Sequence, residues 1–214
     1  MLGAPGAGKG TQCKNIATQY GLLHLSSGDI LRQERAAGTK LGKKAQNYMD
    51  CGALVPDEII IEMMTKEIDK APAAGFILDG FPRTVNQAVQ LDKSLACSHQ
   101  EIDAVLNLKI DERAVAKRIT GRRSCPRCGA VYHIENLKPE VEGLCDNDGT
   151  ELVQRPDDGP PKVVANRLKA YRQQIEPLVD YYRNNSTVYD IDADRDIDEV
   201  RACIFENLDA LVKA

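Results

Sequence analysis

The chain has 214 residues, of which 43% are hydrophobic and 28% are charged, and its formal net charge is −4. This length allows one large hydrophobic core with room for an insertion or two. The slightly acidic balance argues against a nucleic-acid partner, and no apolar run is long enough to cross a membrane. The seven cysteines are odd in number and unevenly spaced, which favours free thiols in a reducing, cytoplasmic compartment over a disulfide framework.

The first element is a glycine-rich loop at residues 3–11, with the sequence Gly-Ala-Pro-Gly-Ala-Gly-Lys-Gly-Thr. Its glycines allow positive φ angles, so that backbone N–H groups can converge on phosphate oxygens, and Lys9 adds a mobile positive charge. A helical pattern follows as far as Gln19 and would point a helix N-terminus at the anion. A glycine-rich turn without a ligand is the plain alternative, but Lys9 and the helix favour nucleotide binding. Because the chain opens directly into this loop, we expect no signal peptide.

The strand that normally precedes such a loop has only Met1 and Leu2 to form it. A strand in the middle of a parallel sheet usually needs about five residues. Either the chain has lost its start or the first strand is a stub. In both cases we expect the missing apolar residues to lower stability.

Strand and helix patterns alternate through the rest of the chain. We expect strands at residues 22–25, 76–79, 104–108 and 187–191, and helical segments at 30–49, 58–70, 84–95, 111–120, 163–183 and 197–212. Ser27 or Asp29 would cap the helix that begins near Ile30. Short apolar strands separated by helices predict an α/β fold, a doubly wound parallel sheet with helices on both faces.

The composition changes sharply at residues 124–161, which are rich in cysteine, glycine and proline and contain short β-like pieces. We interpret this segment as a small inserted domain. Its candidate metal ligands form two pairs, each with two residues between its members: Cys125 with Cys128, and Cys145 with Asp148. Two such pairs can close a tetrahedron around zinc, and a site filled by protein ligands alone would be structural.

The fourth ligand of this zinc site is less certain than the three cysteines. Asp148 stands where a four-cysteine site would have cysteine, although a carboxylate oxygen is an acceptable zinc ligand. Asp146 and His133 are alternatives for that position. Surface cysteines without a metal are the plain alternative to the whole site.

Charged residues at element ends indicate phosphate chemistry. Asp79 ends a predicted strand, where an acid can hold water on Mg²⁺, although a simple helix cap is the alternative. Six arginines fall at element ends or segment junctions: Arg32, Arg83, Arg118, Arg122, Arg155 and Arg167. One arginine alone would be a surface charge, but six suggest a converging phosphate clamp, because guanidinium binds phosphate oxygens bidentately.

Taken together, these motifs resemble those of the adenylate kinases, in the long form with a metal-binding lid. The resemblance covers essentially the whole chain in order, at residues 3–11, 26–32, 79–84, 121–123 and 155–158. Gly10 followed by Thr11 is the loop variant typical of nucleoside monophosphate kinases, and the run Asp-Gly-Phe-Pro-Arg from Asp79 is highly specific to them. The resemblance implies a P-loop fold and reversible phosphoryl transfer from MgATP to AMP, giving two ADP, by a cytoplasmic monomer that uses Mg²⁺ and a structural Zn²⁺.

The resemblance also implies which residues contact each nucleotide. The expected ATP contacts are Gly6, Ala7, Gly8, Lys9, Gly10, Thr11, Arg118, Arg122, Val131, Tyr132 and, through its backbone, Arg195. The expected AMP contacts are Ser27, Arg32, Ala53, Leu54, Val55, Gly80, Phe81, Pro82, Arg83 and Gln87, with Arg155 and Arg167. Gln87 would contact the adenine edge.

The catalytic group implied by the resemblance is mostly cationic. Its expected members are Lys9, Arg83, Arg122, Arg155 and Arg167, with Asp157 and Asp158 positioning the arginines as a lid closes. Asp79 would hold Mg²⁺ through water. The family often has Gly-Thr before the basic residue near the C-terminus, whereas this chain has Ala193 and Asp194 before Arg195.

The same resemblance divides the chain into a core and two inserts. The core would comprise residues 1–25, 56–121 and 160–214, the AMP-binding insert 26–55, and the zinc-containing lid 122–159. Other hypotheses are a kinase for UMP or CMP, a zinc-ribbon binding module switched by nucleotide, and an inactive scaffold. The long lid and Gln87 favour AMP over other monophosphates.

Overall fold

The computed structural model describes residues 1–212, and a parallel β-sheet lies at its centre. Its strands are β1 (Leu2–Gly3), β2 (Leu23–Ser26), β3 (Phe76–Asp79), β4 (Ala104–Lys109) and β7 (Thr187–Asp192). β4 pairs in parallel with β1 and β7, and β2 pairs in parallel with β3, so the sheet consists of a three-stranded and a two-stranded ladder. The amino group of Met1 donates to the carbonyl oxygen of Leu78 at 2.7 Å, which places β1 between β3 and β4. The first strand is thus short and central.

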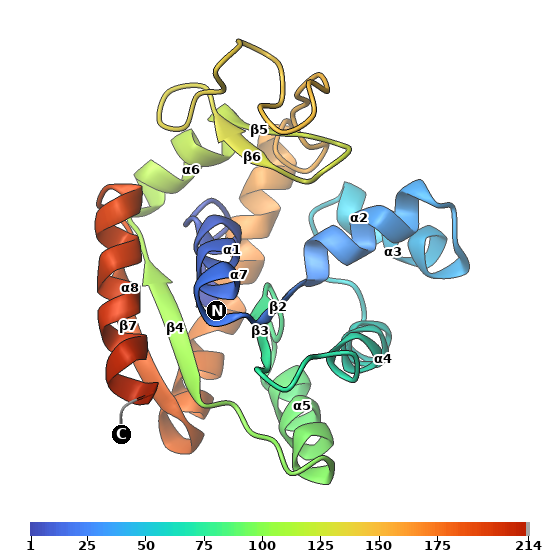
Figure 1. Ribbon diagram of the computed structural model, residues 1–214. Coiled ribbons are helices and arrows are strands. Elements are labelled where there is room, and N and C mark those ends of the chain that lie inside the picture. The colour runs from blue at the N-terminus through green and yellow to red at the C-terminus, as the bar shows by residue number, and fades with distance from the viewer. Residues whose placement is uncertain (213–214) are drawn as a thin grey trace.

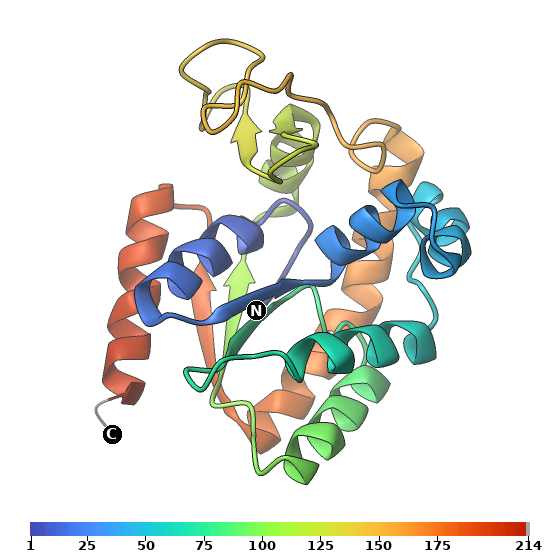
Figure 2. The same cartoon turned by 45° about the vertical axis from the view of Figure 1, so that its right-hand side comes forward.

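Helices cover both faces of this sheet (Figure 1 and Figure 2). They are α1 (Lys9–Tyr20), α2 (Ser27–Ala36), α3 (Lys40–Asp50), α4 (Asp57–Ile68), α5 (Val85–Cys97), α6 (Glu112–Gly121), α7 (Pro161–Asn185) and α8 (Ile197–Val212). Successive side chains of β4 point to opposite faces, as strand geometry requires. Leu106 and Leu108 pack in one cluster with Ile16 of α1 and Ile204 of α8. Val105 packs in another cluster, with α5 and α7. The predicted doubly wound α/β fold is confirmed.

Two parts of the chain project from the sheet, one at the right and one at the top in Figure 1. α2 and α3 form a helical pair on one flank, and the segment after α6 forms a small cap at the top in Figure 1. In this cap β5 (Arg122–Ser124) pairs antiparallel with β6 (Val131–His133). Its buried cluster consists of Cys125, Tyr132 and Cys145, with Ala130 and Leu152 packed against it. So small a cluster gives the cap little apolar core of its own.

The predicted helices are present, with shifted starts. α2 begins at Ser27, three residues before the expected Ile30, and its N-cap is Ser26, whose hydroxyl accepts from the Asp29 backbone N–H. Neither expected cap is free for this role: Ser27 Oγ donates to the carbonyl of Gly80, and the carboxylate of Asp29 pairs with Arg32. In the described part of the chain, no helix is both long and apolar enough to cross a membrane.

Candidate active site

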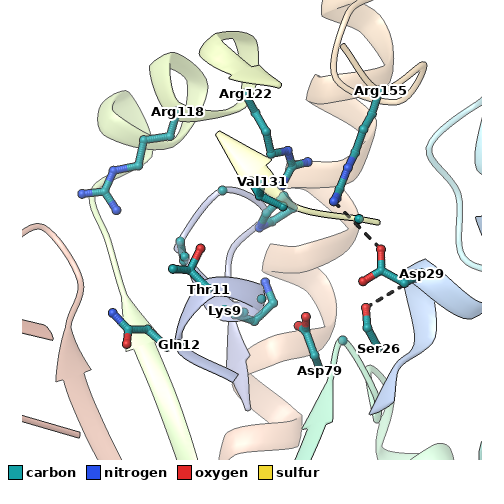
Figure 3. Close-up of a pocket in the computed structure, with 18 of the residues that line it drawn as sticks. Lys9, Thr11, Gln12, Ser26, Asp29, Asp79, Arg118, Arg122, Val131 and Arg155 are labelled. Carbon is teal, nitrogen blue, oxygen red and sulfur yellow. Dashed lines mark hydrogen bonds and ion pairs between the residues drawn. The ribbon is translucent and has the colours of Figure 1, made fainter. Parts of the chain in front are cut away.

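A cavity of about 720 Å³ lies between the sheet, the α2–α3 pair and the cap. Its lining includes the glycine-rich loop, the start of α2, the carboxyl end of β3 and arginines from several elements. Binding sites of open α/β folds occur in this position, outside the carboxyl ends of parallel strands. Figure 3 shows side chains from these separate elements pointing into the same space.

The glycine-rich loop holds its shape through glycine conformations and a folded-back lysine. Gly6 and Gly8 have φ angles of 81° and 94°, which side chains other than glycine rarely adopt. Gly8 is the N-cap of α1 and has no side chain to bond the first N–H groups of the helix, which are therefore available to an anion. Lys9 Nζ donates to the carbonyl oxygens of Gly3 and Ala4, each at 2.8 Å. Burial lowers the pKa of Lys9 to about 8, because it destabilises the charged ammonium form. An anionic partner in the cavity would offset this destabilisation.

Asp79 lies beside this loop at the end of β3, and its surroundings keep it ionised. Burial alone would raise its pKa, but the neighbouring His24 ring and the charge of Lys9 outweigh burial and lower the pKa of Asp79 to about 2. The His24 Nε2 atom is 3.7 Å from Asp79 Oδ2. A Cβ atom on Gly10 would lie 3.2 Å from the same oxygen, a tight contact that would require Asp79 to shift slightly. This crowding favours glycine at position 10, where phosphate loops commonly have Ser or Thr.

The arginines are oriented by buried carboxylates. Asp158, with no exposed surface, accepts two hydrogen bonds from Arg122, at 2.6 and 2.7 Å, and one from Arg167 at 2.7 Å. Arg167 also lies 3.0 Å from Asp157. Arg155 extends from the cap towards Asp29 of α2, with 3.9 Å between charged atoms (Figure 3). These contacts fix guanidinium groups around the cavity before any phosphate binds.

One end of the cavity combines an apolar lining with a single buried amide. Leu31, Met49 and Ile60 line it together with Val55. Gln87 also lines it, is 2% exposed, and accepts from the backbone N–H of Arg83 at 2.7 Å. A flat heterocyclic base fits such a mixture of apolar walls and few polar groups.

The structure brings nearly all of the predicted nucleotide-binding and catalytic residues to this one cavity. Phe81, Pro82 and Asp158 are the exceptions. Phe81 is 1% exposed and packs in the core next to α4 and α5, and Asp158 lies beneath the arginines. Pro82, joined to Phe81 by a cis peptide bond, lines a separate cavity of about 110 Å³. These three residues therefore lie outside the cavity lining and support the residues that form it.

Sequence reasoning overlooked several residues of the cavity wall. Asp29 pairs with both Arg32 and Arg155, and Leu31, Met49 and Ile60 form the apolar end. In sequence the apolar residues look like ordinary core positions of amphipathic helices, so their pattern gave no signal. Asp29 was considered only as a helix cap.

The cap contains a compact cluster of the predicted metal ligands. One donor atom from each of Cys125, Cys128, Cys145 and Asp148 lies within 4.8 Å of the others. The Sγ atoms of Cys128 and Cys145 are 3.5 Å apart, and Cys125 Sγ is 3.5 Å from both carboxylate oxygens of Asp148. Ligand atoms around a tetrahedral zinc ion are separated by about 3.5–3.8 Å, given its usual bond lengths. This donor set therefore fits zinc in type and spacing.

The two alternative fourth ligands have other partners. The His133 ring accepts at Nδ1 from the backbone N–H groups of Glu135 and Asn136. Asp146 accepts from the backbone N–H of Glu140 at 2.8 Å. Only Asp148 joins the three cysteines in the cluster.

Comparison with known proteins identifies the family. The family model for adenylate kinase matches residues 1–187. An adenylate kinase from Archaeoglobus fulgidus is 49% identical over 201 residues, which cover 94% of this chain and 92% of the relative. Adenylate kinases from Lachnospira eligens and Clostridium acetobutylicum are 44% and 48% identical, covering 97% and 94% of this chain and 98% and 93% of their own lengths. The chain belongs to the adenylate kinase family.

Family membership fixes the reaction class. Adenylate kinases are nucleoside monophosphate kinases, and this chain is accordingly a phosphotransferase that acts on ATP and AMP. The family uses magnesium nucleotides, in agreement with an ionised Asp79 beside the phosphate loop. The binding-module and scaffold hypotheses are set aside, because the match spans the chain and includes the loop, the arginines and the cap.

Proposed function

We propose that the cavity binds ATP and AMP together and that its arginines align them for direct phosphoryl transfer. The observation that carries this proposal is the convergence of charged residues from the core, the α2–α3 pair and the cap on one cavity. Phosphoryl transfer needs little covalent chemistry but extensive charge neutralisation and alignment. Guanidinium groups held by buried carboxylates, such as Asp158, supply both without reorganising during the reaction.

In this proposal the two nucleotides occupy opposite ends of the cavity. The ATP phosphates lie on the loop formed by Gly6, Ala7, Gly8, Lys9, Gly10 and Thr11, and the rest of ATP contacts Arg118, Arg122, Val131, Tyr132 and the Arg195 backbone. AMP lies against Ser27, Arg32, Ala53, Leu54, Val55, Gly80, Arg83 and Gln87, with Arg155 and Arg167 between the two nucleotides. The apolar walls and the buried amide of Gln87 support placing the adenine of AMP beside them.

Magnesium enters this proposal with the nucleotide. Mg²⁺ would neutralise phosphate charge on bound ATP. Asp79 would hold it through water, as the ionised carboxylate nearest to Lys9 and Gly10. Lys9 would contact the transferred group, because its ammonium leaves the Gly3 and Ala4 carbonyls for a stronger, charged acceptor.

We also propose that residues 26–55 and 122–159 move as an AMP-binding insert and a lid on a core of residues 1–25, 56–121 and 160–214. Contacts between these parts support closure over the cavity: Arg155 of the lid approaches Asp29 of the insert, and Lys14 of the core donates to the Gly129 carbonyl of the lid at 3.0 Å. Closure would exclude water, which competes with AMP for the phosphoryl group.

Zinc in this proposal stabilises the lid. The Cys125, Cys128, Cys145 and Asp148 cluster leaves no ligand position open for chemistry, and the lid has little apolar core to hold its loops. A structural ion would supply the missing stabilisation. We further propose that the enzyme acts as a monomer in a reducing, cytoplasmic compartment, which its seven free cysteines support.

Two arginine variants test the assignment of the two ends. Arg83→Ala should raise KM for AMP at least tenfold and leave KM for MgATP within about threefold. Arg118→Ala should show the opposite pattern, because Arg118 projects from α6 on the far side of the cavity (Figure 3). Equal changes in both KM values for each variant would refute the assignment.

A further inference from the structure

Asp57 is a charged residue outside the cavity wall that receives three hydrogen bonds. It lies in the first turn of α4, and its carboxylate accepts from Gln87 Nε2 at 2.7 Å, from Thr84 Oγ1 at 2.9 Å and from Asn86 Nδ2 at 2.8 Å. The three donors belong to the start of α5. Gln87 alone among these four residues lines the cavity. Asp57 can thus act on a bound nucleotide only through Gln87.

The surroundings of Gln87 allow one orientation of its side-chain amide. A carboxylate only accepts hydrogen bonds, so the amide nitrogen must face Asp57. The backbone N–H of Arg83 only donates, so the amide oxygen must face Arg83. Turning the amide by 180° would oppose oxygen to carboxylate and N–H to N–H. Both contacts would be repulsive at 2.7 Å.

The fixed amide keeps one hydrogen and one lone pair for the cavity. Each amide nitrogen has two hydrogens and each amide oxygen two lone pairs, and Asp57 and Arg83 use one of each. Adenine presents an acceptor at N1 beside the donor at N6, which complements that pair. Hypoxanthine and guanine present the reverse, a donor at N1 beside an acceptor at O6. The same glutamine in the flipped orientation would suit these bases instead.

We infer that Asp57 is a specificity-determining residue that makes the enzyme select AMP over 6-oxopurine monophosphates by fixing the orientation of Gln87. This inference rests on the proposed contact between Gln87 and the adenine of AMP. Asp57 is a positioning residue, because it touches no substrate and holds the residue that does. Its carboxylate also joins the first turns of α4 and α5, so a purely structural role is the alternative to be tested.

The test compares AMP with IMP as phosphoryl acceptors, because the two differ only at N1 and C6 of the base. Asp57→Ala should lower the ratio of kcat/KM for AMP to kcat/KM for IMP by about tenfold, and KM for MgATP should stay unchanged. Asp57→Asn should keep that ratio within about threefold of the parent, since its amide oxygen can still accept from Gln87. If Asp57→Ala unfolds, Asp57→Ser replaces it, because serine supports a helix start and its hydroxyl is too short to reach Gln87.

A neighbouring acid serves as the matched control. Glu58 lies in the same first turn of α4 and is exposed. Glu58→Ala removes the same charge from the same helix end and should leave the AMP to IMP ratio unchanged. An unchanged ratio in Asp57→Ala, or an equal fall in Asp57→Ala and Asp57→Asn, would overturn the inference.

One more variant separates this inference from the proposed function beneath it. Gln87→Ala should lower the AMP to IMP ratio at least as far as Asp57→Ala. If Gln87→Ala lowers it and Asp57→Ala does not, the adenine contact stands and the role of Asp57 fails. If neither variant changes the ratio, the proposed contact of Gln87 with adenine fails.

Discussion

Replacing Asp158 by Asn removes the charge that holds two arginines in place. The side chain is fully buried and accepts three hydrogen bonds from Arg122 and Arg167 at 2.6–2.7 Å. Asparagine keeps the size, but it loses the charge and places an N–H group against guanidinium donors. Removing one partner of a buried ion pair costs about 3–5 kcal/mol, because the other charge stays buried without compensation. We therefore expect the free energy of unfolding to fall by about 3–5 kcal/mol.

Urea unfolding of the two proteins, with and without saturating ADP, measures this effect. Bound phosphates supply the missing negative charge, so ADP should stabilise the variant by more than it stabilises the parent. Asp157→Asn is the matched control: Asp157 is partly exposed and its carboxylate pairs with Arg167, so the loss should be about 1 kcal/mol or less. A loss below 1 kcal/mol for Asp158→Asn would refute the view that this carboxylate orients the arginines.

Three further predictions concern the metals and the loop. Cys128→Ser should lower Tm by about 5 °C or more while the turnover of folded enzyme falls less than about twofold. A large loss of turnover in enzyme that is still folded would contradict a structural zinc site. Because burial lowers the pKa of Lys9 to about 8, and only the ammonium form neutralises phosphate, kcat/KM for MgATP should fall as pH rises through about 8; a flat profile up to pH ~10 would contradict this role. Asp79→Asn should raise the Mg²⁺ concentration for half-maximal rate by about tenfold or more at unchanged KM for AMP, and an unchanged Mg²⁺ requirement would exclude Asp79 from the metal site.

Motifs and periodic patterns sufficed to predict the fold. The strand at residues 76–79 was predicted with its observed bounds, because a short apolar run ending in an acid has few other interpretations. The start of α2 was predicted three residues late. Its cap depends on contacts made by Ser27 and Asp29 with residues distant in sequence, Gly80 and Arg155, which no local pattern shows.

The candidate site was predictable where function requires a rare residue type. Glycines with positive φ, Lys9 and clustered arginines are visible in the sequence because their positions are unusual. Residues that act through another residue are not visible. Asp57 has the sequence appearance of an ordinary acidic residue at a helix start, and its contact with Gln87, 30 residues away, exists only in the folded chain. Phe81 and Pro82 belong to a specific motif, yet they support the site from the core.

The most direct test of this account measures ADP formation from MgATP with and without AMP, and with UMP, CMP or GMP in its place. We predict rapid formation that requires AMP, with two ADP for each ATP consumed, and much slower reaction with the other monophosphates. ADP formation at the same rate without AMP, or a preference for UMP or CMP, would contradict the account.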